Sequence, residues 1–303
     1  MKCLVTGGAG FIGSNLAIEL EAQGYDVIIV DNLFSGNKEN LREFKGIFIK
    51  ADIADPQFDI EEKIDAIFHE AAITDPRHPD DSETYQKNIE GFKNVIKLAK
   101  KNNAKLVYAS TAGLYGNGYV PMEEGQEKDV LTSYGKSKWD MDLMAEKIAS
   151  TIHIVGLRYF NVFGPKELHK GRPASMIYHL GKQMRQNEKP RLFKYGQQIR
   201  DYIYVKDAVT ATIKALDAKS DVYNVGTGIG TSFIDLVQTI NSVFGKKLEP
   251  EYFDMPYDAK SYQNNTQADI KKAETGLHFK AAWNLKDAIT DYFAYLDKHG
   301  WDL

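Results

Sequence analysis

The chain lacks the features that mark secreted, membrane and nucleic-acid-binding proteins. Its 303 residues include a single cysteine, Cys3, which excludes a disulfide framework and a cysteine-rich metal site. No run of about 18 apolar residues is present to span a membrane, and residues 1–20 lack the basic start and cleavage site of a signal peptide. The net charge of -4 supplies no positive field for nucleic acid or anionic lipid. We therefore expect a cytoplasmic protein without a metal site, whose partners include neither nucleic acid nor a membrane.

The hydrophobic pattern predicts an α/β fold. Hydrophobic residues make up 43% of the chain, which is enough for a sizeable core. Short apolar runs over 2–5, 26–30, 46–50, 66–69, 105–109 and 152–157 alternate with longer helical patterns such as 11–23 and 84–102. Apolar runs of this length between helices are typical of buried parallel strands. The sequence thus predicts a Rossmann-type, doubly wound parallel sheet with helices on both faces.

The pattern changes after Gly164. Residues 165–200 are rich in Lys, Arg, His and Pro, whereas a helix over 204–214 and a buried strand over 222–225 return to the sheet. We therefore predict a dinucleotide-binding domain over 1–165 plus about 201–228. A smaller, discontinuous C-terminal α/β substrate domain is expected over about 166–200 and 229–303, closing a cleft over the cofactor.

A glycine-rich turn follows the first strand. Gly7 permits the turn, Gly10 allows the backbone to approach a pyrophosphate, and Gly13 allows the helix to pack against the strand. The start of the helix, with Phe11 and Ile12, directs amide donors at the anion. In this strand, turn and helix context, the three glycines indicate a dinucleotide cofactor.

The end of the second strand bears on the choice between NAD and NADP. Asp31 lies 18 residues after Gly13, near where a carboxylate binds the adenosine ribose hydroxyls, which favours NAD. Asn32, Lys38 and Arg42 follow, close enough in sequence to bind a 2′-phosphate, which favours NADP. Ordinary solvated charges would explain Lys38 and Arg42 equally well.

Further cofactor contacts are expected where other strands end, because an open parallel sheet binds its ligand at the carboxyl ends of its strands. Residues at these ends should flank adenine and ribose: they are Asp52, Ile53, Ala71 and Ala72, and we add Asn88 from the predicted helix.

A tyrosine and a lysine four residues apart, Tyr134 and Lys138, provide a candidate proton-transfer pair. Free tyrosine, with a pKa near 10, is a poor base at neutral pH. An ammonium on the same helix face, together with an oxidised nicotinamide, would stabilise the phenolate and lower its pKa. By itself this spacing is common on surface helices. The upstream glycine turn, which indicates a dinucleotide cofactor, favours a catalytic role for the pair. Lys138 could also hold the nicotinamide ribose.

Two hydroxyls, Ser110 and Thr111, follow the fifth predicted strand and should face the cleft. Thr111 is expected to hydrogen-bond the reacting oxygen, and Ser110 to contact the cofactor. Satisfying backbone groups of the loop is the alternative role for Ser110.

The glycine turn, the Ser-Thr pair and the Tyr-Lys pair, in this order, resemble the extended short-chain dehydrogenase/reductase family. Members of that family epimerise, dehydrate or reduce nucleotide sugars, and the resemblance covers the whole chain. The 4,6-dehydratases carry Asp-Glu directly after the threonine, where this chain has Ala112 and Gly113. The resemblance therefore implies an epimerase or a reductase.

Several segments look like the ADP-L-glycero-D-manno-heptose 6-epimerase family: 68–72, 158–165, 167–171, 200–202 and 262–269 are the main ones. That resemblance implies that Lys170 is a second acid/base across the sugar from Tyr134. Taken alone, Lys170 is more typical of a solvated loop or a phosphate contact. The substrate-binding residues implied are Asn161, His179, Arg200 and Tyr262, and Arg172 and Phe193 lie where nucleotide or sugar would bind.

The sequence therefore favours a nucleotide-sugar epimerase that uses NADP, with NAD as the alternative, and acts on a nucleotide-diphosphate sugar. A homo-oligomer is expected because members of the family often pair helices of the sheet domain. A UDP-hexose 4-epimerase is the nearest alternative, since it would use Tyr134 without Lys170. A more distant alternative is a non-catalytic protein that binds a partner according to its nucleotide state.

Overall fold

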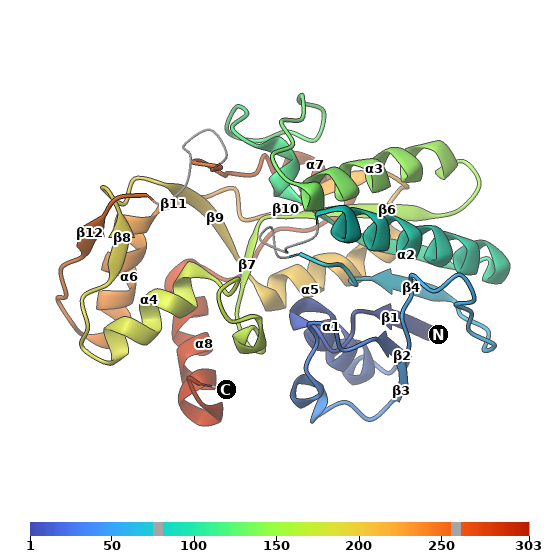
Figure 1. Cartoon of the computed structure of the whole chain (residues 1–303), viewed down its shortest axis with the longest axis horizontal. Helices are drawn as coiled ribbons and strands as arrows, with labels where there is room; N and C mark the ends of the chain where they lie inside the picture. The colour runs from blue at the N-terminus through green and yellow to red at the C-terminus, as the bar shows by residue number, and fades with distance from the viewer. Residues whose placement is uncertain (75–80, 256–261, 303) are drawn as a thin grey trace.

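The computed structural model describes residues 1–74, 81–255 and 262–302. Its largest element is a parallel sheet of seven strands in the order β10-β6-β5-β4-β1-β2-β3 (Figure 1). These strands are β1 (Lys2–Thr6), β2 (Asp26–Asp31), β3 (Ile47–Lys50), β4 (Ala66–His69), β5 (Lys105–Thr111), β6 (Ile154–Tyr159) and β10 (Val222–Val225). The predicted α/β, Rossmann-type doubly wound sheet is confirmed.

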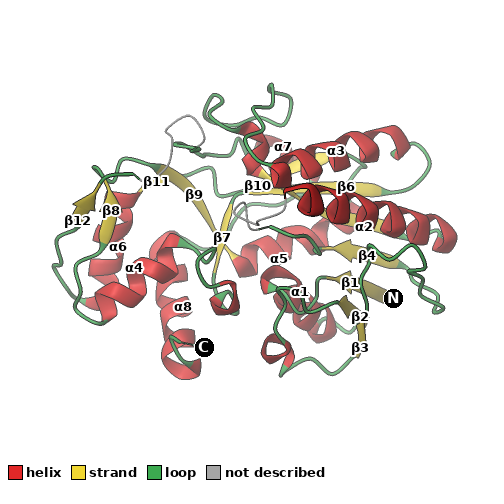
Figure 2. Ribbon diagram, viewed as in Figure 1, coloured by secondary structure: helices red, strands yellow, loops and turns green. Residues whose placement is uncertain are grey.

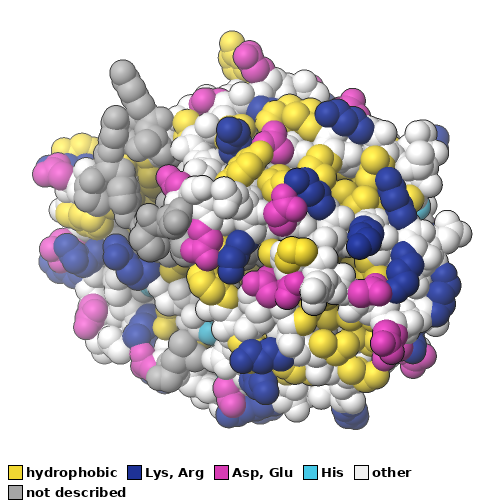
Figure 3. Space-filling view, turned by 45° about the vertical axis from the view of Figure 1, so that its right-hand side comes forward, with side chains coloured by type: hydrophobic (Ala, Val, Ile, Leu, Met, Phe, Trp, Pro, Cys, Tyr) yellow, Lys and Arg dark blue, Asp and Glu magenta, His cyan; other side chains and the backbone are white. Residues whose placement is uncertain are grey.

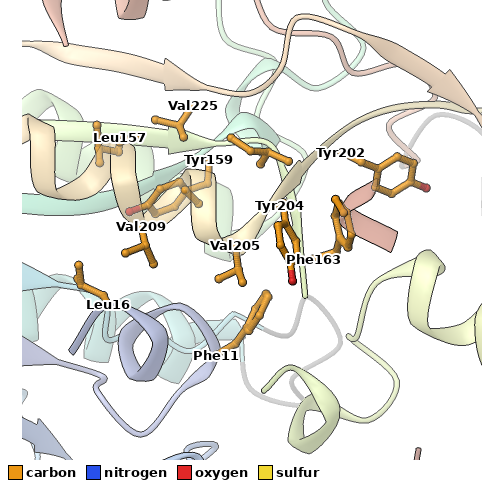
Figure 4. Close-up of a cluster of buried hydrophobic side chains, with 14 of the residues drawn as sticks. Phe11, Leu16, Leu157, Tyr159, Phe163, Tyr202, Tyr204, Val205, Val209 and Val225 are labelled. Atoms are coloured by element: carbon orange, nitrogen blue, oxygen red, sulfur yellow. The ribbon is translucent and has the colours of Figure 1, made fainter. Parts of the chain in front are cut away.

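Helices cover both faces of this sheet, as Figure 2 shows. The helices α1 (Phe11–Ala22) and α5 (Val205–Lys214) pack together on one face, and α2 (Asp81–Asn102) packs with α3 (Ser133–Ile148) on the other. Successive strand residues alternate between two cores: Cys3 and Val5 pack beneath α1 and α5, whereas Leu4 packs beneath α2 and α3. Figure 4 shows the first core, where Leu16 of α1 and Val209 of α5 meet the strands. Because helices cover both faces, the inner strands β1, β2, β4 and β5 consist largely of apolar residues.

A second group of strands and helices lies to one side of the large sheet (Figure 1). A three-stranded sheet has the order β11 (Gly230–Ser232), β9 (Ile199–Tyr204) and β7 (Asn161–Phe163), and β12 (Glu251–Phe253) pairs with β8 (Arg191–Phe193). The helices beside them are α4 (Met176–Arg185), α6 (Phe233–Phe244) and α8 (Leu285–His299), while α7 (Lys271–Gly276) contacts β10. Aromatic packing joins these helices, since the rings of Phe244 and Phe293 stack with centroids 4.9 Å apart. Short 3-10 helices complete the chain: η1 (Lys38–Leu41), η2 (Ala112–Tyr115), η3 (Leu168–Lys170) and η4 (Ala215–Asp217).

The structure shifts some predicted boundaries. The strand predicted over 152–157 is β6, Ile154–Tyr159, and Ser110 and Thr111 are the last residues of β5 instead of following it. The helix predicted from residue 204 begins at Val205, because residues 199–204 form the unpredicted strand β9. The division into two domains near residue 165 stays a prediction.

On the face drawn in Figure 3, acidic and basic side chains are interspersed with apolar ones, and neither sign dominates. Within the described ranges, no helix is both long and apolar enough to cross a membrane. The same residues contain no group of three or more His, Cys, Asp or Glu side chains that could hold a metal ion.

Candidate functional site

Two adjoining cavities open where the strands of the large sheet end. One, of about 110 Å³, is lined by the ends of β2 and β3, and the other, of about 740 Å³, extends past β5 and α3 toward β7 and β9. Gly7, Gly10, Phe34, Ser35, Glu70, Ala72 and Ile73 line both. The two cavities thus form one elongated site along the carboxyl edge of the sheet, where parallel α/β sheets bind ligands.

The glycine turn packs too closely against the protein's own backbone to accommodate side chains at Gly7 and Gly13. Gly7 has a φ of +69°, and a Cβ there would lie 2.6 Å from the backbone nitrogen of Ala71. A Cβ on Gly13 would lie 2.3 Å from the carbonyl oxygen of Gly7. The first-turn amides of α1, which begins at Phe11, have no acceptor within the helix and lie at the larger cavity. This arrangement fits a pyrophosphate.

The smaller cavity fits the adenosine half of a dinucleotide. The Asp31 carboxylate accepts hydrogen bonds from the backbone amides of Ala9 (3.0 Å) and Leu33 (2.7 Å), which fix it at the wall. Burial raises the pKa of Asp31, and these two hydrogen bonds oppose the rise. A Cβ on Gly36 would lie 2.8 Å from Asp31 Oδ1, so that glycine keeps the carboxylate accessible.

Most predicted adenosine contacts line this cavity: Asp31, Asn32, Asp52, Ile53, Ala71, Ala72 and Asn88. The Asn88 amide is engaged within the protein, because it bonds both backbone polar groups of Ile73 and the Ser137 hydroxyl. Lys38 is not in the lining, and its ammonium lies 5.3 Å from the centroid of the Phe48 ring.

The proton-transfer pair lies at the larger cavity. Thr132 caps α3 by accepting from the Gly135 amide (3.0 Å), which places Tyr134 in the first helical turn beside the end of β5. There the phenol hydrogen-bonds with Thr111. One turn further, the Lys138 ammonium donates to the carbonyl of Ala109 (2.8 Å) and lies 5.8 Å from the centroid of the Tyr134 ring. Ser110, also predicted, lines the same cavity.

Burial sets the acidities of this pair in the protein alone. Burial raises the pKa of Tyr134 to about 12, although the Thr111 hydrogen bond acts to lower it. Burial also lowers the pKa of Lys138 to about 8, against the attraction of Glu70 and Asp142. In the protein alone the phenol pKa is therefore raised, because burial outweighs the Thr111 hydrogen bond. A cationic ligand at the cavity would have to supply the remainder.

Lys170 reaches the same cavity from a tightly held loop. Its ammonium lies 5.4 Å from the centroid of the Phe11 ring, and burial lowers its pKa. The fully buried Glu167 carboxylate accepts from the Gly164 amide (3.3 Å) and from the amide and hydroxyl of Ser175 (2.7 and 2.8 Å). These three hydrogen bonds hold the loop that carries Lys170 against the start of α4.

Contacts of the Asn40 side chain connect this loop to the glycine turn. The side-chain amide of Asn40 donates to the carbonyl of Ala9 (3.0 Å) and lies 3.0 Å from Nδ1 of His169. The residue before Lys170 is thereby held against the glycine turn.

Only some of the predicted substrate residues line the cavity. Asn161, Arg200 and Tyr262 do, and Arg200 lies 5.2 Å from the centroid of the Tyr262 ring. Nη1 of Arg200 donates to the carbonyls of Ile199 and Asn264, whereas Nε and Nη2 have no hydrogen-bond partner among the described residues. These free donors suit a diphosphate.

The structure does not bring the other three to the cavity wall. His179 Nε2 lies 3.2 Å from the carbonyl of Arg172, outside the lining. The Phe193 ring packs edge-on against Tyr262, behind the wall.

Sequence reasoning missed other residues that line the cavity, among them Phe34, Glu70, Met176 and Phe233. Glu70 had an available signal, since a carboxyl directly after the buried run 66–69 sits at a strand end. No sequence signal marked Met176 and Phe233, because each begins a helix in a part of the chain without a recognised motif.

A Rossmann sheet, a glycine turn and a Tyr-Lys pair at one cavity define a nicotinamide-dependent enzyme of the short-chain dehydrogenase/reductase type. Comparison with known families narrows this class. The NAD dependent epimerase/dehydratase family matches residues 3–226, and the chain belongs to that family. The predicted membership in the extended family, and the prediction of an enzyme, are confirmed.

Relatives of two specificities resemble the chain. An ADP-L-glycero-D-manno-heptose-6-epimerase of Brachyspira hyodysenteriae is 34% identical, over 98% of both chains. A putative UDP-glucose 4-epimerase of Methanocaldococcus jannaschii is 36% identical, over 94% of this chain and 95% of that one. The comparisons thus establish a sugar-nucleotide epimerase without fixing its substrate.

Solved structures show the same two specificities. The Helicobacter pylori ADP-L-glycero-D-manno-heptose-6-epimerase has a TM-score of 0.90 and 33% identity, covering 98% of this chain and 96% of that one. The UDP-glucose-4-epimerase of Stenotrophomonas maltophila, with bound NAD and formylated UDP-arabinopyranose, has a TM-score of 0.88 and 28% identity, covering 99% and 98%.

Proposed function

We propose that this epimerase inverts C6 of an ADP-glycero-manno-heptose, using a bound NADP that is reduced and reoxidised within each turnover. The observation that carries the proposal is the shared cavity of Tyr134 and Lys170. Inversion of a carbinol needs proton transfer as the alcohol is oxidised and again as the ketone is reduced from its other face. Two proton-transfer groups on different elements meet that need.

The residues of this chain would divide the work as follows. A nicotinamide held at this cavity would supply the acceptor for the hydride of the carbinol carbon and its source on return. Tyr134 takes the hydroxyl proton on one side, with Thr111 hydrogen-bonded to the phenol. Lys138 supplies positive charge beneath the phenol, and its ammonium is oriented by the Ala109 carbonyl.

Lys170 would act on the opposite orientation of the sugar. Burial lowers the pKa of Lys170, which makes its ammonium a better proton donor than an exposed lysine. Arg200 would bind the diphosphate through Nε and Nη2, which bond to none of the described residues, and would thereby anchor the nucleotide while the sugar turns.

Inversion of a UDP-hexose at C4 is the second candidate. The 36% identical relative and the Stenotrophomonas structure support it. In that reaction the ring turns about the diphosphate and Tyr134 serves both faces, so that Lys170 is not required.

The decisive experiment follows sugar stereochemistry by NMR in deuterated water, with ADP-D-glycero-D-manno-heptose and UDP-glucose in parallel. Inversion at C6 supports the proposal, and inversion at C4 supports the second candidate. Lys170→Met should abolish C6 inversion. The matched control is Lys166→Met in the same loop, because the Lys166 ammonium faces Glu43 at 3.9 Å and is absent from the lining of the main cavity. C6 inversion at the full rate in Lys170→Met would contradict the assigned role.

The choice of NADP rests on the heptose resemblance and on Asn32 in the adenosine cavity. Asp31 in the same wall favours NAD. Mass spectrometry of the nucleotide released on denaturing the purified protein distinguishes them.

A further inference from the structure

Glu70 is an ionisable group in the cavity that the proposed mechanism does not use. It follows β4 directly and lines both the adenosine and the catalytic cavities. Its position at the junction of the two cavities places it beside the path that any bound dinucleotide must take.

The hydroxyls beneath Glu70 form a chain of three short contacts. Glu70 Oε1 lies 3.0 Å from the Tyr159 hydroxyl, which lies 2.6 Å from the Thr212 hydroxyl. The Thr212 hydroxyl lies 2.7 Å from the carbonyl of Ala208, one turn back on α5. Tyr159 and Thr212 are buried, so the chain ends inside the core.

Counting hydrogens shows which form of Glu70 completes this chain. Three oxygen-to-oxygen contacts need three hydrogens, and Tyr159 and Thr212 supply one each. With an ionised carboxylate, one contact of the Thr212 hydroxyl, at 2.6 Å to Tyr159 or at 2.7 Å to the Ala208 carbonyl, has no hydrogen between its two oxygens. A carboxylic acid on Glu70 supplies the third hydrogen, and each of the three contacts then contains one hydrogen.

The charges around Glu70 come from few groups. On α3, Lys138 attracts its carboxylate and Tyr134 is the neighbouring phenol, while β6 presents Tyr159 and α5 presents only the Thr212 hydroxyl. The adjacent His69 lies on the other face of the strand, where its ring stacks on Phe92. Burial raises the pKa of Glu70 to about 7, against Tyr159 and Lys138, so a new positive charge nearby can remove its proton.

We propose that Glu70 is a neutral carboxylic acid when the nicotinamide is absent or reduced, and a carboxylate when the nicotinamide is oxidised and cationic. This inference rests on the proposed function, because it requires a nicotinamide at the cavity. The proton is exchanged with solvent through the cavity that Glu70 lines. The proton of Glu70 takes no part in the oxidation of the sugar, in which the hydride goes to the nicotinamide and the hydroxyl proton to Tyr134.

By linkage, the affinity for oxidised relative to reduced cofactor then rises with pH across the Glu70 titration, by up to about tenfold per pH unit. Below this pH range Glu70 is neutral with either cofactor, so it no longer favours binding of the oxidised form.

Infrared difference spectroscopy of the full-length protein tests this directly. Wild-type protein is loaded with NAD+ or NADH, and with NADP+ or NADPH in parallel, and the carbonyl stretch of protonated carboxyl groups is followed against pH. We expect a carboxylic-acid band near neutral pH with the reduced cofactor, which disappears with the oxidised one. Mixing oxidised cofactor with cofactor-free protein should release up to one proton per site, measured with a pH indicator.

Glu70→Gln is the informative variant, because its amide can donate to Tyr159 as the acid does and so preserves the chain. It should bind cofactor, lack the redox-dependent band and release no proton. Glu124→Gln is the matched control: burial also raises the pKa of Glu124, but that residue lines neither cavity. A band that persists with oxidised cofactor, or that survives Glu70→Gln, overturns the proposal. Absence of any dinucleotide binding would overturn the proposed function as well, and cofactor absorbance reveals that case separately.

Discussion

Replacing Glu167 with glutamine should destabilise the protein and loosen the loop that carries Lys170. The carboxylate accepts three hydrogen bonds, through Oε1 from Gly164 and the Ser175 hydroxyl, and through Oε2 from the Ser175 amide. Glutamine retains one acceptor oxygen, so its NH2 group must face at least one of these donors. One charge-assisted bond is lost and one buried donor is left unpaired, which costs about 2 kcal/mol. For a chain of this size the midpoint of thermal unfolding should fall by about 5 °C.

The assay is urea unfolding of wild type and variant, with the free energy obtained from the midpoint at an unchanged slope. Glu43→Gln is the control: its carboxyl is 69% exposed and lies 3.9 Å from Lys166 in the same region, so its stability should match wild type. Wild-type stability in Glu167→Gln would show that the hydrogen bonds of the Glu167 carboxylate do not support this loop.

Three further predictions concern the turn, the charge and the substrate side of the site. Gly13→Ala should lower the free energy of unfolding by about 1–3 kcal/mol and reduce retained cofactor, because its Cβ meets the Gly7 carbonyl at 2.3 Å. Gly125→Ala, where the added Cβ has no neighbour within 4 Å, should change neither stability nor cofactor content. Equal cofactor content in the two variants would argue against the turn as the pyrophosphate site. The pKa of Lys138 is about 8 in the folded protein against an ordinary value of 10.5, so the unfolded chain binds more protons between these two values. Wild type should therefore gain about 1.4 kcal/mol per pH unit relative to Lys138→Met as the pH rises through this interval, and a flat difference in unfolding free energy would contradict its burial as a charge. Asp201→Asn should cost about 1–3 kcal/mol in chemical unfolding, because Asp201 accepts from the amides of Thr227, Gly228 and Ala268 and an amide group would face at least one of them; an unchanged midpoint would show that these loops do not depend on it.

Local sequence patterns were sufficient for the fold class and for much of the site. The glycine turn works through backbone conformation within seven consecutive residues, and the Tyr134 and Lys138 pair through the pitch of one helix. Such features are set by neighbours in the sequence, and therefore a single sequence reveals them.

Long-range packing was out of reach of the same reasoning. Glu70, Tyr159 and Thr212 come from the end of β4, from β6 and from α5, and no local spacing links them. The pKa of Tyr134 was predicted to fall beside Lys138 and an oxidised nicotinamide, whereas burial raises it in the protein alone, and no local pattern shows how deeply α3 buries the phenol against β5. His179 also illustrates the limit: α4 starts at Met176 and turns its apolar side inward, so that the His179 ring faces the Arg172 carbonyl and not the cavity.

The chain passes from the seven-stranded sheet to the three-stranded sheet across a single residue. Phe160 lies between β6 and β7, its amide donates to the Val225 carbonyl (3.0 Å), and its ring stacks on Tyr115. This junction contains no loop, so the last residue of β6 and the first residue of β7 keep a nearly constant separation. At this point the two sheets can rotate about Phe160 but cannot slide along each other. Any widening of the cavity for a sugar that reverses its face would therefore be a rotation of one sheet about this residue.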